Sequence, residues 1–267
     1  MIDQKIVINK LPAITAAFWT MKICATTLGE TAGDLLAQTL KVGYAISSAI
    51  LLGFFFVTLG IQLFSKKYHP VIYWLVILAT STAGTTMSDF MDRTLGLGYA
   101  AGAFILASLL AITLLIWRGV EKSLSVTEIK SKRGEIFYWT AILISNTLGT
   151  ALGDFLSDNS GLEFLGGAVL IGSLLSLIIL AHYFTKISSV ILFWMAFVLT
   201  RPFGATFGDL LTKTPDKGGL GFGTIGSSGI LFGILVILVF NEIRKQKKEA
   251  LNLMGDLKVL HYYLDNF

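Results

Sequence analysis

The sequence predicts an all-α polytopic membrane bundle of about eight transmembrane helices, and three observations carry that prediction. Hydrophobic residues make up 54% of the 267 residues and charged residues only 14%, whereas soluble domains carry about 25% charged residues. The apolar residues gather in eight stretches, each near the roughly 20 residues that a helix needs to cross a bilayer. A tryptophan–aspartate pattern recurs four times. A disordered chain and a disulfide-linked scaffold are excluded, and a soluble enzyme is not expected.

The apolar stretches follow one another along most of the chain. Spans are expected at about residues 12–36, 43–64, 70–90, 96–117, 136–157, 163–184, 188–211 and 221–240. They are rich in Gly, Ala, Ser and Thr, which let membrane helices pack closely. We therefore assign residues 1–240 to a single transmembrane domain. Residues 241–267, where leucines recur at nearly helical spacing after a basic run, are expected to form a cytoplasmic amphipathic tail.

Lys and Arg are distributed unevenly between the two sides of the predicted bundle. If the spans alternate in direction, 15 of the 21 basic residues lie on the side of the chain termini and four on the opposite side. Because cytoplasmic loops carry the excess of Lys and Arg, both termini are predicted to be cytoplasmic. The net charge of +4 is explained by this topology, so no nucleic-acid partner is expected.

A fourfold repeat is the strongest pattern in the chain. Tryptophan precedes aspartate by 15 residues at Trp19–Asp34, Trp74–Asp89, Trp139–Asp154 and Trp194–Asp209, and successive units are 55, 65 and 55 residues apart. The first two units therefore recur as a pair after 120 residues, which predicts pseudo-twofold halves. Each unit holds two spans, so the four units are parallel repeats. Their approximate bounds are residues 11–65, 66–118, 131–185 and 186–240.

Two small residues precede each repeated aspartate, one of them five residues before it and the other directly before it. The pairs are Gly29 and Gly33, Gly84 and Ser88, Gly149 and Gly153, and Gly204 and Gly208. Small residues at this spacing let membrane helices approach closely. The motif helices are therefore predicted to touch either each other or the second span of their unit.

These motif segments resemble a known family. Thr27-Leu-Gly-Glu-Thr-Ala-Gly-Asp34, Thr82-Ala-Gly-Thr-Thr-Met-Ser-Asp89 and Thr147-Leu-Gly-Thr-Ala-Leu-Gly-Asp154 are similar to the bacterial "membrane-anchored protein" family, built from four copies of a short membrane repeat of unknown function. The resemblance extends from about residue 11 to residue 240, and the fourth unit departs from it at Arg201-Pro202-Phe203-Gly204. It implies a multi-pass protein of the bacterial inner membrane and brings no activity with it.

Each motif helix is expected to carry a polar stripe, because residues four apart share a helix face. The stripes are Thr26, Glu30 and Asp34; Ser81, Thr85 and Asp89; Asn146, Thr150 and Asp154; and Arg201, Ala205 and Asp209. A carboxylate facing lipid is costly, so the stripes should converge inside the bundle. We expect an acidic vestibule open to the outer side. A Glu30–Arg201 pair is the simplest way to accommodate those two charges near mid-membrane.

Other interpretations of individual residues stay open at this stage. Lys22 either extends toward the cytoplasm or belongs to the cavity. The repeated aspartates either form a site or cap helix ends. Motifs typical of nucleotide-binding, zinc-protease and serine-hydrolase enzymes are missing from the sequence. We therefore expect no enzymatic activity and no cofactor.

Carboxylate and hydroxyl oxygens suit small hard cations. The sequence thus predicts a transporter or channel for such a cation, most simply a divalent ion such as Mn²⁺ that is substrate rather than cofactor. The predicted metal ligands are Glu30, Asp34, Asp89, Asp154 and Asp209, and the other path-lining residues are Thr26, Thr85, Asn146, Thr150 and Arg201. The alternatives are a proton-coupled transporter of a small carboxylate anchored by Arg201, and a non-transporting scaffold. The expected partners are the lipid bilayer and the cation, with a homo-oligomer left open.

Overall fold

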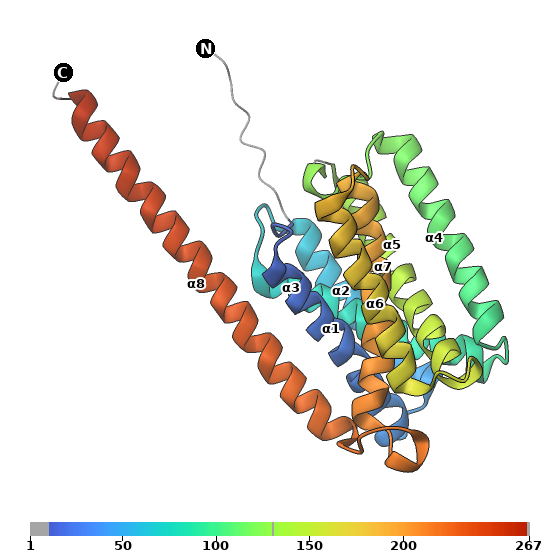
Figure 1. Ribbon diagram of the computed structural model, residues 1–267. Coiled ribbons are helices and arrows are strands. Elements are labelled where there is room, and N and C mark those ends of the chain that lie inside the picture. Colours follow the sequence, from blue (N-terminus) through green and yellow to red (C-terminus); the bar gives the residue numbers. More distant parts are fainter. Residues whose placement is uncertain (1–10, 130, 266–267) are drawn as a thin grey trace.

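The computed structural model describes residues 11–129 and 131–265, and within these residues it is built from helices without strands (Figure 1). The eight long helices are α1 (Ala16–Asp34), α2 (Tyr44–Phe64), α3 (Pro70–Asp89), α4 (Tyr99–Glu121), α5 (Lys132–Asp154), α6 (Glu163–Phe184), α7 (Ser189–Thr212) and α8 (Gly223–Asp265). The first ten residues of the predicted domain and the last two of the predicted tail lie outside the described part.

Seven helices of the described chain are long and apolar enough to cross a membrane, so the protein is a multi-pass helical bundle. α1 falls outside that group because Lys22, Glu30 and Asp34 interrupt its apolar sequence. It nevertheless lies among the membrane-spanning helices of the bundle (Figure 1). The predicted all-α bundle of parallel two-helix repeats is confirmed.

The four motif helices form a closed inner ring. α1 contacts α3, α3 contacts α5, α5 contacts α7, and α7 returns to α1. The outer helices cover this ring, with α2 on α3, α4 on α5, α6 on α7 and α8 on α1. Each unit therefore uses its second helix to cover the motif helix of the next unit, and α8 closes the circle. We call the end of the bundle where α1 begins the terminus side, and the opposite end the Asp side (Figure 1).

Small residues allow the inner helices to touch. In each motif helix, the glycine five residues before the aspartate packs against the next motif helix. The residue it meets there lies eight positions before the aspartate of that next helix. The four pairs are Gly29–Ser81, Gly84–Asn146, Gly149–Arg201 and Gly204–Thr26. A Cβ added to Gly84 would lie 3.0 Å from the carbonyl carbon of Asn146. The structure thus selects the first of the two predicted partners, since the motif helices pack on each other.

The first three motif helices continue past their aspartates, which the sequence pattern did not predict. Each passes into one short π-helix, namely Leu35–Thr39, Phe90–Thr94 and Phe155–Asn159. In the first unit, the Leu40 amide donates to the Leu35 carbonyl over 2.9 Å. The reversal that follows contains two residues with positive φ, Lys41 and Gly43 in unit one and Gly96 and Gly98 in unit two. Glycine adopts this conformation at no steric cost.

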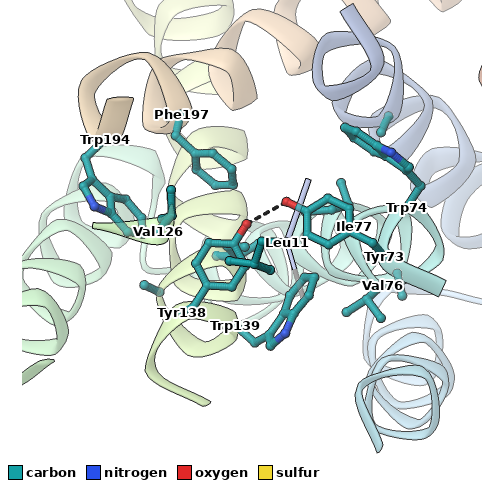
Figure 2. Packing of buried hydrophobic residues seen from close by; sticks show 14 of the residues in the cluster. Leu11, Tyr73, Trp74, Val76, Ile77, Val126, Tyr138, Trp139, Trp194 and Phe197 are labelled. Atoms are coloured by element: carbon teal, nitrogen blue, oxygen red, sulfur yellow. Dashed lines mark hydrogen bonds between the residues drawn. The ribbon is translucent and has the colours of Figure 1, made fainter. Parts of the chain in front are cut away.

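Aromatic side chains fill the ring on the terminus side (Figure 2). Tyr73 of α3 and Tyr138 of α5 are almost fully buried and share a hydrogen bond of 2.6 Å between their hydroxyls. Phe18 and Phe193 occupy the equivalent positions on α1 and α7, with ring centroids 6.4 Å apart. The repeated tryptophans pack beside them. The terminus side of the inner helix ring is therefore closed by aromatic side chains.

α8 differs from the other outer helices in its length. Its 43 residues correspond to about 65 Å at 1.5 Å per residue, roughly twice the thickness of a bilayer core. The helix has no break at residue 240, where the span was expected to end, and it leaves the bundle toward its C-terminus (Figure 1). Span and predicted tail thus form one continuous helix.

Candidate functional site

The polar stripes of the four motif helices meet inside the inner ring, as their helical spacing predicts. We call this set of side chains the polar column. No member is more than 4% exposed. Its residues are Thr26, Glu30, Asp34, Ser81, Thr85, Asp89, Asn146, Thr150, Asp154, Arg201, Ala205 and Asp209. All ten predicted site residues are among them, so the ring isolates a polar interior from lipid.

The centre of the column is a buried ion pair. Arg201 Nη2 lies 3.0 Å from Glu30 Oε2, with Arg201 fully buried and Glu30 almost so. The same nitrogen donates to Thr150 Oγ1 over 2.8 Å and to the Thr85 hydroxyl. Arg201 Nη1 donates to the Thr26 carbonyl over 3.2 Å. All four motif helices therefore contribute to the pair, which is the condition for tolerating buried charges.

Lys22 continues the column toward the terminus side. Its Nζ lies 3.5 Å from Asn146 Oδ1 and 3.9 Å from the centroid of the Phe197 ring. Asn146 Nδ2 in turn donates to Thr80 Oγ1 over 2.9 Å. Lys22 has no exposed surface. The interpretation in which it extends toward the cytoplasm is wrong, because its face of α1 points into the ring toward Phe197.

The four repeated aspartates, Asp34, Asp89, Asp154 and Asp209, form an aspartate layer at the Asp side of the column, and Lys213 pairs with one half of it. Its Nζ lies 2.7 Å from Asp34 Oδ2 and 3.1 Å from Asp209 Oδ1. Burial by itself lowers the pKa of the Lys213 ammonium, but the carboxylates of Asp209 and Asp34 outweigh it, and the net shift is upward. Lys213 therefore carries its charge at neutral pH. We call Asp34, Asp209 and Lys213 the Lys half of the layer.

Arg93 pairs with the other half. Arg93 Nε lies 2.7 Å from Asp89 Oδ1, and Nη2 lies 3.3 Å from Asp154 Oδ2. A third carboxylate, that of Asp158, lies 3.9 Å from Nη2. The Tyr99 ring centroid lies 5.4 Å from the guanidinium carbon. We call Asp89, Asp154 and Arg93 the Arg half.

Sequence reasoning missed both cations. Each stands four residues after a repeated aspartate, Arg93 after Asp89 and Lys213 after Asp209. Residues at this spacing are neighbours on a helix surface, so the signal was present. The sequence predicted an acidic vestibule open to the outer side, and the structure contradicts this. The four aspartates are only 2–4% exposed, because Arg93 and Lys213 lie over them.

Three carboxylates gather at the Lys half. Glu30, Asp34 and Asp209 each offer one oxygen, and these oxygens lie within 4.8 Å of one another. This cluster combines the centre of the column with the aspartate layer, and it does not include Asp89 or Asp154. Carboxylate oxygens at such spacing can ligate a hard cation.

A cleft of about 380 Å³ opens at the Asp side beside this cluster. Lys213 lines it together with Gln38 and Thr39 from the end of the first motif and Thr224 from the start of α8. Lys213 is 22% exposed. Its ammonium therefore stands between the aqueous cleft and the buried carboxylates.

Comparison with known families finds the fourfold pattern again. The sequence model described as "Repeat of Unknown Function (DUF347)" matches the chain at residues 17–68, 72–123, 137–188 and 192–248. Neither the curated proteins nor the solved structures contain a match.

Proposed function

The chain belongs to the family of this Repeat of Unknown Function (DUF347), whose description names no activity, and we propose from the site geometry that it transports a small hard cation. In this proposal the protein lies in the inner membrane with both termini in the cytoplasm, and it carries out no chemical conversion. Glu30, Asp34 and Asp209 bind the cation, and when the cation is absent Lys213 pairs with Asp34 and Asp209 while Arg201 pairs with Glu30.

The observation that carries the proposal is the position of the Lys213 ammonium. It contacts Asp34 and Asp209, two of the three clustered carboxylates, and it reaches them from a cleft. An entering cation would replace it by electrostatic exchange. Such exchange avoids the cost of leaving buried carboxylates without a counter-ion.

The charge balance favours a divalent cation. Once Lys213 moves away, Glu30, Asp34 and Asp209 carry three negative charges, and Arg201 balances that of Glu30. Two charges remain, which one divalent cation neutralises. A monovalent cation would need a proton as well. All the side-chain ligands are oxygens, which suit Mn²⁺, Mg²⁺ or Ca²⁺.

The remaining polar column supports a path across the membrane. Thr85, Thr150 and Asn146 continue the polar side chains inward from the cluster, and the aromatic layer around Tyr73 and Tyr138 closes the ring beyond them. In this conformation Lys213 and Arg93 cover the aspartates, so the path is closed at the Asp side as well. Transport requires Lys213 to move away and the aromatic layer to open in a second conformation.

The carboxylate-transport alternative has less support, because both terminal nitrogens of Arg201 already donate to protein oxygens. For the scaffold alternative, no contact among the described residues gives specific support.

Flux into sealed vesicles that contain the purified protein tests the proposal. Wild type, Asp34→Asn and Asp209→Asn are compared under gradients of Mn²⁺, Mg²⁺, Na⁺ and pH. Asp216→Asn is the matched control, because Asp216 is an exposed aspartate of the α7–α8 loop outside the cluster. We expect flux of a divalent cation in wild type and in the control, and its loss in the two cluster variants.

Background flux of every cation in wild type would overturn the transport proposal. Flux that persists in Asp34→Asn and Asp209→Asn would leave transport standing but move the binding site elsewhere. Circular dichroism and size-exclusion chromatography of each variant show whether a loss reflects unfolding.

A further inference from the structure

An apolar groove runs between α3 and α8 on the terminus side of the bundle. It extends from Val71 to Leu78 on α3 and from Phe232 to Ile243 on α8, with a volume of about 240 Å³. Trp74 forms part of its wall. The groove is remote from the Asp side and plays no part in the transport proposal.

The groove lies where α8, which packs mainly on α1, passes beside the start of α3. Near the Asp side, Thr224 Oγ1 lies 2.7 Å from Thr39 Oγ1, and Ser228 Oγ donates to Thr31 Oγ1 over 2.9 Å. The Cys24 thiol donates to the Leu231 carbonyl over 3.4 Å. Beyond this point Leu235 is still buried and Val239 packs against the core, and α8 leaves the bundle only farther toward its C-terminus (Figure 1). Its apolar face lines the groove instead of packing fully on α3.

The length of the groove matches one leaflet of a bilayer. Phe232 and Ile243 are eleven residues apart, which is about 16 Å along a helix at 1.5 Å per residue. Half of a hydrocarbon core is about 15 Å. The side chains that line the groove are all aliphatic or aromatic. A single acyl chain of the leaflet on the terminus side therefore has the right length and chemistry to lie in it.

Basic side chains stand where the groove reaches the headgroup level. Ile243 lies twenty residues after the start of α8 at Gly223, or about 30 Å, the thickness of the hydrocarbon core. Arg244 and Lys247 follow in the next turn, and both are exposed. On the α3 wall, the exposed Lys66 and Lys67 precede the helix.

Acidic side chains also lie on this stretch of α8. Glu242 lies directly before Ile243, but Arg244, Lys245, Lys247 and Lys248 give this stretch of α8 a positive balance. Lys245 also lies 3.9 Å from Glu249, so that charge is partly engaged. Arg244 and Lys247 follow the groove-lining Phe240 and Ile243 by four residues and therefore continue the same helix face. The rim thus complements a negatively charged headgroup.

We propose that the α3–α8 groove binds one anionic phospholipid, with an acyl chain along Phe232–Ile243 and the phosphate near Arg244 and Lys247. A neutral phospholipid has the same chains but gains less from the basic rim. Each basic side chain near an anionic membrane contributes about a fivefold increase in binding. The groove is therefore selective for headgroup charge.

Tryptophan quenching by brominated lipids tests the proposal. The full-length protein is reconstituted in phosphatidylcholine vesicles with increasing fractions of brominated phosphatidylglycerol or brominated phosphatidylcholine. We expect the anionic lipid to quench at a several-fold lower fraction. Trp74→Phe should remove this difference, because Trp74 lines the groove.

A pair of double variants isolates the headgroup contact. Arg244→Gln with Lys247→Gln should abolish most of the preference, whereas Arg118→Gln with Lys122→Gln should preserve it. The control pair removes the same charge at the end of α4 on the far side of the bundle (Figure 1). Equal quenching by the two lipids in wild type, or equal loss in both double variants, would overturn the proposal.

A second copy of the chain is the competing occupant of the groove. It would shield Trp74 from both brominated lipids and would cross-link through Val236→Cys in the membrane. That combined result would overturn lipid binding and assign the groove to a dimer interface. Because neither readout measures cation flux, lipid binding and transport stand or fall separately.

Discussion

The Lys half and the Arg half of the aspartate layer are formed by the same repeated motif, but their buried carboxylates are paired with different cations. In the Arg half, one guanidinium contacts Asp89 and Asp154 through separate nitrogens and lies near Asp158 as well. In the Lys half, a single ammonium joins Asp34 and Asp209 and borders a cleft. Arg forms a planar fork that suits several fixed carboxylates, whereas Lys is a point charge on a flexible stem.

This difference shows how an almost fourfold ring becomes asymmetric. Glu30 adds a third carboxylate beside the Lys half, while its counterparts on α3 and α5 are Thr85 and Thr150. The Arg half is thus suited to a permanent structural contact. The Lys half is suited to exchange of its ammonium group for a bound cation.

The largest effect is expected from Arg93→Met. Two buried carboxylates, Asp89 and Asp154, would lose their shared cation, and breaking a buried pair costs about 3–5 kcal/mol. Because Arg93 is 38% exposed, we expect the low end, about 3 kcal/mol. Thermal unfolding in detergent measures the loss, and added Mn²⁺ should not restore it. Restoration by Mn²⁺ would mean that the Arg half also exchanges its cation.

The next largest loss of stability is expected from Gly208→Ala, because Gly208 packs against Glu30. A Cβ added to Gly208 would lie 2.9 Å from the Glu30 Cβ, so Gly208→Ala should displace Glu30 and destabilise the protein by about 1–3 kcal/mol. Divalent-cation binding should weaken with it, as measured by isothermal titration calorimetry. Gly53→Ala on the outer helix α2 is the control, because it meets open space. Equal effects of both substitutions would argue against close packing at the Lys half.

A smaller and opposite effect is expected from Lys213→Ala. Without its built-in competitor, the site should bind a divalent cation about tenfold more tightly and release it more slowly, since every 1.4 kcal/mol is a tenfold change. The half-saturating concentration in the vesicle assay should fall together with the maximal rate. Lys217→Ala, in the same loop, should change neither. A half-saturating concentration that rises would show that Lys213 assists binding instead of competing with it.

The smallest effect is a pH dependence introduced by Lys213→His. The raised pKa of Lys213 keeps it charged across neutral pH, so this residue gives wild type no pH dependence there. Histidine has an ordinary pKa of about 6.5, which Asp34 and Asp209 would raise. As pH rises above that value the imidazole loses its charge, and cation affinity should increase several-fold. An affinity that stays flat in the variant from pH 6 to well above the raised imidazole pKa would contradict the exchange mechanism.

Much of the fold and of the column followed from local patterns in the sequence. The four-residue spacing of Glu30 and Asp34, repeated at Thr85 and Asp89, placed these side chains on one helix face, and the cost of facing lipid directed that face inward. The same reasoning brought Arg201 to Glu30. The short π-helices after the motifs escaped prediction, because their hydrogen bonds depend on the reversal that follows at Gly43 and Gly98.

The sequence by itself determined the membrane-spanning helices, the fourfold repeat and the inward polar stripes, since each depends on residues within a few turns of one another. The tertiary structure alone decided how the charges are shared. Lys213 reaches Asp34 across 179 residues of sequence, and Arg93 reaches Asp154 across 61. Ion pairing between helices depends on which helices are neighbours in the ring, and local periodicity carries no information about that order.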